Sequence, residues 1–245
     1  MSSIIKEMSW MEFDERRKHT DTVIIPSGAI EVYGPQLPLG TDTIVAEEVS
    51  KMIAQKLDAL IGPTVQVGES YSLGMFPGTL VIRPEHFKNY ISDIFESLIK
   101  WGFTRFIFMN THAGNTPIIS QVIREYQDKF DLKCVEIDWW RFVQPNGLDI
   151  FENKGYMAHG HASECGTSVM MYLKPEMVRM DKLVNALPKK VGHYTEYTDF
   201  IKFRSFDTLT DIGSVGDSTA ASVEKGEKIV NRCVDRIVEF VQNEL

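Results

Sequence analysis

The chain has 245 residues, of which 43% are hydrophobic and 24% charged, ordinary proportions for a globular protein with a sizeable core. Its formal net charge is −8 and no basic run interrupts it, which argues against nucleic acid as a partner. No apolar stretch is long enough to cross a membrane and the first residues are polar, so we expect no membrane partner and a cytoplasmic location. The cysteines Cys134, Cys165 and Cys233 are odd in number and far apart, which favours reduced thiols over disulfides.

The first third of the chain predicts helices and strands in alternation. A short helix over residues 8–19 precedes an apolar strand over residues 22–25, which we expect Pro26 to end. A loop rich in proline and glycine follows, and from Asp42 onward apolar side chains recur at the spacing of one helical face. A short strand is also predicted over residues 80–82.

The rest of the chain continues this alternation. Helices with one apolar face are predicted over residues 84–101 and 116–126, the first opened by a proline in its first turn. Residues 105–109 and 132–137 predict strands, the first of the fully buried kind. A long final helix is predicted to begin at Asp217.

Strands that alternate with helices predict an α/β fold, in which a mostly parallel sheet is covered by helices on both faces. No internal repeat, low-complexity segment or linker divides the chain, so we expect a single domain over residues 1–245. In such folds, ligands bind beyond the carboxyl ends of the strands. The loops after the predicted strands are therefore the places to look for function.

The loop after the first strand contains two carboxylates, Glu31 and Asp42. Its prolines and glycines fix the backbone path, and rigid loops on a scaffold often carry catalytic groups. Each residue also has an ordinary interpretation, because Asp42 could cap the following helix and Glu31 could be a solvated loop charge. The choice between these interpretations depends on what other loops contribute.

Two further loops supply the same kind of chemistry. His112 follows the predicted strand at residues 105–109, and His161 and Glu164 form a His-x-x-Glu pair. Carboxylates and imidazoles together are a ligand set for a divalent ion, and such mixed ligands suit zinc, manganese or iron. The sequence lacks the Gly-x-Ser-x-Gly nucleophile motif and phosphate-binding glycine motifs. Cys165 is a minor alternative as a nucleophile, because a cysteine at an apolar helix start is usually inert.

Five segments, in order, resemble the creatininase (creatinine amidohydrolase) family. They are Pro26 to Asp42, the Phe-Pro-Gly-Thr of residues 76–79, Asn110 to Asn115, His161 to Ser168, and Gly216 to Ala221. The resemblance spans nearly the whole chain. It implies a three-layer α/β/α sandwich, a divalent metal site, hydrolysis of small cyclic or linear amides, and a homo-oligomer that is often a hexamer.

Residue by residue, the resemblance implies that Glu31, Asp42 and His112 are metal ligands, with Asp42 at the position of a carboxylate that bridges two ions. His161 matches a histidine near the substrate, and Trp140 matches an aromatic side chain beside the ligand pocket. His159, two residues before His161, is the control for that assignment.

The chain also departs from the family pattern. Tyr33 stands where the family has a metal-binding histidine, Gln36 replaces another histidine, and Gly166 replaces a glutamate. Creatininase has a metal-binding glutamate at the position of Gly114, so we expect Glu164 to supply that carboxylate from another loop. A neutral tyrosine is a poor ligand, and the sequence leaves open whether one or two ions bind. A single ion is sufficient to polarise a carbonyl and activate a water.

The altered loop with Tyr33 and Gln36 looks closer to the branch of 3-dehydro-scyllo-inosose hydrolases, which open oxidised inositol rings. Tyr33, Gln36, Asn110 and Asn115 would suit a polyol ring as hydrogen-bonding partners. We therefore predict a metal-dependent hydrolase of a small polar cyclic carbonyl compound, with His161 as the proton shuttle and Tyr33 orienting the substrate. The alternatives are an amidohydrolase that cleaves a cyclic amide or formamide C–N bond, and a non-catalytic relative that binds a small molecule.

Overall fold

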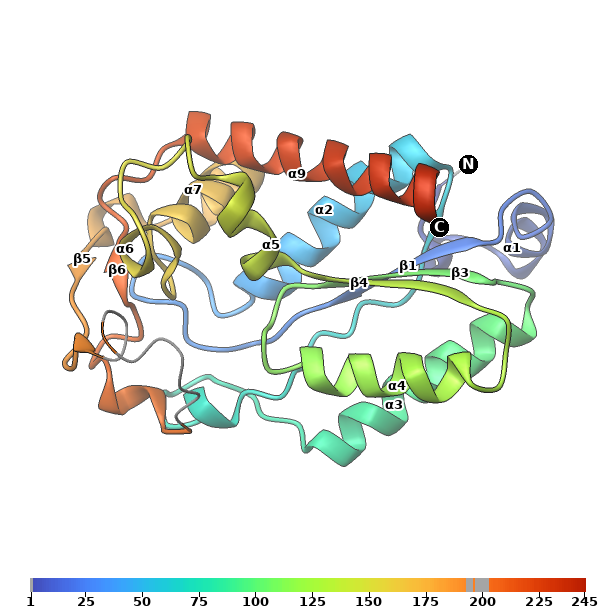
Figure 1. The fold of residues 1–245 in the computed structure, drawn as a ribbon, viewed down its shortest axis with the longest axis horizontal. Helices are drawn as coiled ribbons and strands as arrows, with labels where there is room; N and C mark the ends of the chain where they lie inside the picture. Colours follow the sequence, from blue (N-terminus) through green and yellow to red (C-terminus); the bar gives the residue numbers. More distant parts are fainter. Residues whose placement is uncertain (1, 193–195, 197–202) are drawn as a thin grey trace.

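A parallel sheet of four strands in the order β2-β1-β3-β4 runs through the middle of the molecule (Figure 1). The computed structural model describes residues 2–192, 196 and 203–245. The strands of the sheet are β1 (Thr22–Ser27), β2 (Leu60–Ile61), β3 (Arg105–Asn110) and β4 (Lys133–Asp138). Because all four strands are parallel, the carboxyl ends of β1, β3 and β4 meet at one edge.

Helices cover both faces of this sheet. One face carries α2 (Thr41–Leu57), α5 (Trp139–Asn146), α7 (Glu164–Leu173) and α9 (Val223–Glu244), and the other carries α3 (Pro84–Lys100) and α4 (Thr116–Gln127) (Figure 1). The expected α/β fold with three layers is confirmed. The described residues also form α1 (Trp10–Arg16), α6 (Tyr156–His159), the strand pair β5 (Asn185–Ala186) and β6 (Gly216–Asp217), and short 3₁₀ turns that include Tyr71–Leu73.

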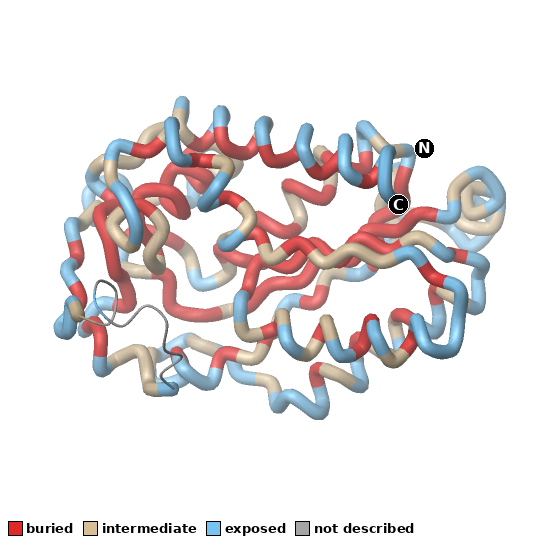
Figure 2. The backbone as a smooth tube through the Cα atoms, in the orientation of Figure 1, coloured by how far each residue is buried: buried red, intermediate tan, exposed pale blue. Residues whose placement is uncertain are grey.

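The two faces of the sheet bury two separate apolar clusters. Along β1, Ile24 packs with α2 and α9, whereas its neighbours Val23 and Ile25 pack with α3 and α4. Side chains of a strand point alternately to its two faces, so one fully apolar strand serves both layers. Figure 2 shows the buried backbone along the strands and along the inward faces of the helices. This burial fixes the position of the end of β1, where the loop that contains Glu31 begins.

The structure differs from the sequence prediction at the end of β1 and at residues 80–82. β1 does not stop at Pro26 but continues to Ser27, because proline lacks only the amide hydrogen and its carbonyl still accepts from Val65. Residues 80–82 form no strand, since the amides of Leu80 and Ile82 bond to two different segments. No helix among the described residues has the length and apolarity needed to span a bilayer.

The final helix begins at Val223 and not at Asp217. Asp217 pairs with Asn185 in the small β5-β6 sheet, and its carboxylate accepts from the amide and hydroxyl of Thr219. This local turn competes with helix formation, as aspartate side chains commonly do. Ser222 then caps the helix by accepting the amide of Lys225.

Candidate metal centre and substrate pocket

Three predicted ligands, Glu31, Asp42 and His112, meet at the carboxyl edge of the sheet. Each offers a ligand atom that lies within 4.8 Å of the other two. Nδ1 of His112 is 3.2 Å from Oε2 of Glu31 and 3.3 Å from Oδ2 of Asp42. All three side chains are buried, with exposed fractions of 2%, 1% and 6% for Glu31, Asp42 and His112. We call this group the ligand trio.

The strand ends and loop contacts hold the trio in place. The amide of Glu31 donates to the carbonyl of Leu39 and closes the loop after β1. Asp42 lies in the first turn of α2, where a negative charge is favoured by the helix dipole. His112 follows β3, and the hydroxyl of the preceding Thr111 donates to the backbone carbonyl of Asp42 at 2.7 Å. The loops after the two central strands are thereby joined directly beside the trio.

A second set of groups orients each ligand. Ser70 donates its hydroxyl to Glu31 at 2.7 Å, and the indole N–H of Trp140 donates to Asp42 at 2.9 Å. Nε2 of His112 lies 2.6 Å from the backbone carbonyl of Glu69, which can only accept, so the proton is assigned to Nε2. Nδ1 then faces the two carboxylates, and its lone pair becomes available to a cation once Nδ1 gives up its proton. Metal-binding histidines are typically held by a hydrogen bond of this kind.

The charges of the trio are tightly coupled. Burial alone would lower the pKa of His112, but Glu31 and Asp42 outweigh burial and raise that pKa well above its usual value. Burial would raise the pKa of Glu31, but His112 lowers it, whereas the pKa of Asp42 is raised by burial and by Glu31. A divalent cation would replace the positive charge of the imidazolium between these carboxylates. Two carboxylates and one imidazole therefore fit such an ion.

Glu164 does not join the trio, contrary to the ligand set expected from the sequence. Its fully buried carboxylate accepts the ammonium of Lys225 at 2.7 Å and the backbone amides of Glu152 and Asn153 at 2.9 and 3.0 Å. Burial would raise the pKa of Glu164, but Lys225 and these donors lower it. The residue thus ties a loop to α7 and α9, and its lone pairs are already used.

The pocket beside the trio has a volume of about 240 Å³ and is walled by aromatic side chains. The ring of Tyr33 lies 4.3 Å from that of His161 and 6.2 Å from that of Trp140, measured between centroids. Burial and the charges of Asp42 and Glu31 raise the pKa of Tyr33 well above its usual value, so its hydroxyl stays protonated. Tyr33 is therefore a neutral donor in this wall.

His161 lines the same pocket with a defined tautomer. Its Nε2 lies 2.6 Å from the carbonyl of Val32, which assigns the proton of the neutral ring to Nε2 and leaves Nδ1 as the acceptor. Cys165 also lines the pocket, but burial raises the pKa of its thiol well above the usual value. The prediction of an inert thiol agrees with this placement, since the thiolate is the nucleophilic form.

Three predicted substrate-binding residues serve the scaffold instead. Gln36 is fully buried and donates to the carbonyl of Ala162 at 2.7 Å. The amides of Asn110 and Asn115 donate to backbone carbonyls of the adjoining loops at 2.9 and 3.0 Å. None of the three is among the described residues that line the pocket, whereas Trp140 is. The side-chain amides of these three residues therefore hold the loops of the site together and do not face the pocket.

Glu69 is a pocket residue that the sequence reasoning missed. It precedes the loop of residues 71–79 that proline and glycine fix, and it follows no regular strand, so the rule of searching after strands passed over it. Its carboxylate lies close to Gly114, at 2.8 Å from the point where a Cβ of residue 114 would stand. The sequence signal that could have identified Glu69 is an acidic residue directly before the loop of residues 71–79.

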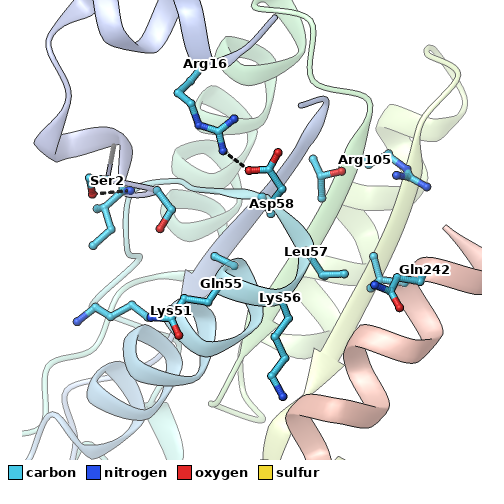
Figure 3. Close-up of a pocket in the computed structure, with 15 residues that line it drawn as sticks. Ser2, Arg16, Lys51, Gln55, Lys56, Leu57, Asp58, Arg105 and Gln242 are labelled. Carbon is cyan, nitrogen blue, oxygen red and sulfur yellow. Dashed lines mark hydrogen bonds and ion pairs between the residues drawn. The ribbon is translucent and has the colours of Figure 1, made fainter. Parts of the chain in front are cut away.

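A larger pocket of about 780 Å³ lies at the opposite end of the sheet, where β1 and β3 begin (Figure 3). Two of its charged groups are already paired: Arg16 with Asp58 at 2.6 Å, and Lys56 with an aspartate of α9. The trio is elsewhere, so the larger volume does not mark the functional site.

Comparisons with known proteins identify a family over nearly the whole chain. The family model described as creatinine amidohydrolase matches residues 6–241. The creatinine amidohydrolase of Pseudomonas putida is 28% identical, over 99% of this chain and 97% of its own. The mycofactocin precursor peptide peptidase of Mycolicibacterium smegmatis is 28% identical over 88% and 83%. The 3-dehydro-scyllo-inosose hydrolase of Thermotoga maritima is 25% identical over 96% and 81%.

Solved creatininases have the same fold. A manganese creatininase superposes with a TM-score of 0.85 at 27% identity, covering 100% of this chain and 99% of that one. A mutant creatininase of the zinc–zinc type gives 0.86 at 26% identity, covering 100% and 98%. With a family match that runs almost from end to end and a buried trio of metal-ligand type, this chain belongs to the creatininase family of hydrolases.

Proposed function

We propose that the protein is a divalent-metal-dependent hydrolase that opens a small polar ring at a carbonyl carbon. The observation that carries this proposal is the buried ligand trio beside a pocket walled by Tyr33, Trp140 and His161. At about 240 Å³ the pocket is smaller than the usual range of about 300–1,000 Å³ for ligand sites. That size suits one small ring.

Glu31, Asp42 and Nδ1 of His112 would hold the ion, for which manganese, zinc or iron are the candidates. When bound, such an ion supplies a Lewis acid and lowers the pKa of a water to about 7. The manganese and zinc creatininases are solved structures of similar fold. We favour one ion per chain, because Tyr33 stands where the family has a metal-binding histidine and its neutral phenol is a poor ligand.

The remaining steps fall to side chains of this chain. Tyr33 would donate a hydrogen bond to the substrate, as its neutral phenol permits. Water adds its oxygen to the carbonyl carbon while the bond from that carbon to the adjacent ring atom breaks. His161 would carry the proton from the water to the leaving ring atom through Nδ1, the acceptor nitrogen of its ring. The products are a carboxylic acid and a protonated leaving atom on one opened chain.

The leaving ring atom separates the candidate substrates. A carbon atom leaves in the ring opening of an oxidised inositol, the reaction that the name of the Thermotoga relative points to. A nitrogen atom leaves in a cyclic amide, which the name of the Pseudomonas relative supports. We place the oxidised inositol first because Tyr33 adds a donor that a hydroxylated ring can use. A non-catalytic role fits less well, since buried carboxylates without a cation are costly.

The test begins with metal content. Protein purified from metal-supplemented culture should contain one manganese, zinc or iron per chain, and dialysis against a chelator should remove activity. The loaded protein is then screened against dehydro-inositols, cyclic amides, formamides and lactones. Protein that neither contains nor takes up an ion would exclude the hydrolase assignment. Light scattering on the same sample tests the further proposal of a homo-oligomer, for which a hexamer is the family's common form.

A further inference from the structure

The pocket beside the trio has an uneven charge balance. Its described lining contains three carboxylates, those of Glu31, Asp42 and Glu69, but no lysine or arginine. A divalent ion would balance Glu31 and Asp42. The charge of Glu69 is then left over inside a pocket whose other described walls are neutral or imidazole groups.

Glu69 is not placed as a fourth ligand. It is absent from the group of described ligand atoms that lie within 4.8 Å of one another. Its backbone carbonyl accepts Nε2 of His112, which is the ring nitrogen opposite to the one that faces the trio. Its carboxylate lies on the Nε2 side of the imidazole, since a Cβ at Gly114 would stand 2.7 Å from Nε2 of His112 and 2.8 Å from Oε2 of Glu69.

The carboxylate of Glu69 has little to neutralise it. Among the described residues none forms a salt bridge with it, and its hydrogen-bond donor is the amide of Tyr71 at a long 3.3 Å. Glu69 is half-buried, so solvent screens its charge only in part. Burial lowers the pKa of His159, another imidazole of this lining, so that ring adds no positive charge near neutral pH.

Gly114 makes this arrangement possible. A Cβ at residue 114 would lie 2.2 Å from the backbone carbonyl oxygen of Glu69 and 2.8 Å from its Oε2. Both distances are far shorter than a van der Waals contact, so any side chain at residue 114 would displace Glu69. The missing side chain thus leaves the room in which the carboxylate meets the pocket.

We propose that Glu69 is a specificity-determining residue that admits neutral and cationic ring compounds and rejects anionic ones. The inference rests on the proposed function, since it takes the ion to balance Glu31 and Asp42. It specifies the substrate further: the part of the ring remote from the reacting carbonyl carries hydroxyl, ammonium or amidinium donors, and no carboxylate or phosphate.

The test uses three γ-lactams that differ in one substituent next to the ring nitrogen: aminomethyl, hydroxymethyl or carboxylate. Their binding to the metal-loaded protein is measured by calorimetry and ligand-observed NMR, which need no turnover. We expect the carboxylate to bind at least about tenfold more weakly than the aminomethyl compound, as for unit charges a few ångströms apart near a surface. Glu69→Gln should reduce that ratio to about threefold or less.

Glu85→Gln is the matched control, because it removes one exposed carboxylate from the first turn of α3, outside the pocket lining. It should leave the ratio unchanged. Equal binding of the three lactams, binding of none of them, or an unchanged ratio in Glu69→Gln would overturn the inference. So would a tenfold loss of metal affinity in Glu69→Gln, which would make Glu69 a ligand. A separate metal titration tests the proposed function itself, so the two failures are distinguishable.

Discussion

At the scale of single residues, Tyr33 separates this chain from the family pattern. Its phenol is buried and neutral, so it can donate to a substrate but is a poor anionic ligand. Tyr33→Phe should leave metal content unchanged and lower kcat/KM by about tenfold or more, since an unsatisfied buried partner costs about 1–3 kcal/mol. Metal analysis and steady-state kinetics on the same preparation check this.

Two companion results would separate the explanations for Tyr33. Tyr33→His should raise the number of ions per chain without improving turnover of the true substrate. If Tyr33→Phe released the metal, the phenolate would be a ligand and the orienting role would be wrong.

His161 and His159 offer a matched pair for the proton transfer. His161→Ala should keep the metal and lower kcat by about a hundredfold, the usual worth of a positioned acid–base group. His159→Ala should have a smaller effect, because the ring of His159, which also lines the pocket, packs edge-on against Phe151. Stopped-flow or steady-state kinetics measures both. Equal losses in the two variants would remove His161 from its assigned role.

At the scale of elements, the loop at Gly114 supports the metal site from outside. The Cβ of Gly114→Ala would push the carbonyl of Glu69 away from His112, which depends on that carbonyl for its tautomer. Loss of such an outer partner typically costs about 10–100-fold in metal affinity. Isothermal titration with manganese or zinc measures the loss.

Gly40→Ala is the control for this loop variant. Gly40 precedes α2, has a negative φ of −88°, and its Cβ would meet only Ile44 at an ordinary 3.9 Å. Its metal affinity should match that of the natural protein. A Gly114→Ala protein with full affinity would show that the Glu69 carbonyl does not orient His112.

The ion pair of Glu164 and Lys225 joins α7 to the start of α9. Glu164→Gln leaves the largely buried ammonium of Lys225 with Glu152 as its remaining ion-pair partner, so the loss in the free energy of unfolding should lie below the about 3–5 kcal/mol typical of a buried charge left unpaired. Urea denaturation should show this loss. The double variant with Lys225→Met should recover part of it, and metal affinity should change in neither. Metal loss in Glu164→Gln alone would restore Glu164 as a ligand.

At the scale of the whole molecule, Glu136 on β4 makes stability depend on pH. Burial, with a contribution from Asp138, raises the pKa of Glu136 from 4.5 to about 7. Between these two pH values the folded state holds a proton that the unfolded state has released. The contribution of this proton to the free energy of unfolding is full below pH 4.5 and is lost as pH rises through about 7. Full burial would make this about 3 kcal/mol, and solvent screening of a half-buried group reduces it to about 1–2 kcal/mol.

Glu136→Gln removes this dependence. Its free energy of unfolding should fall less between pH 5 and pH 8 than that of the natural protein, as measured by urea denaturation. Ser120, which donates to Glu136 at 2.6 Å, keeps an acceptor in the amide variant. Identical pH profiles for the two proteins would contradict the raised pKa.

Much of this architecture could be predicted because its signals are local. The apolar run of β3 predicts a strand and the one-sided apolar pattern of α3 predicts a helix, each from a short stretch of sequence. Glu31, Asp42 and His112 could be grouped because each follows a strand, and carboxyl ends of parallel strands converge. The hydrophobic pattern and the rule that ligands bind at strand ends were sufficient to group these three residues.

The failures share a different cause, which is a partner far away in the chain. The residues next to Glu164 in the sequence do not indicate that it pairs with Lys225, and those next to Gln36 do not indicate that it bonds to the carbonyl of Ala162. A polar residue in a motif looks the same whether it faces a ligand or a backbone group of another loop. Only the packed structure shows which lone pairs are already used.

The trio also joins parts of the chain that are distant in sequence, with Glu31 and Asp42 after β1 and His112 after β3. An ion bound by the trio would link the loops that follow the two central strands, β1 and β3. Neither loop could then open without first releasing the ion. Amide hydrogens of the loops at residues 28–40 and 111–115 should then exchange with deuterium more slowly in the loaded protein, while the centre of the sheet exchanges at the same rate. Hydrolytic chemistry and the local rigidity of this edge would have one common source.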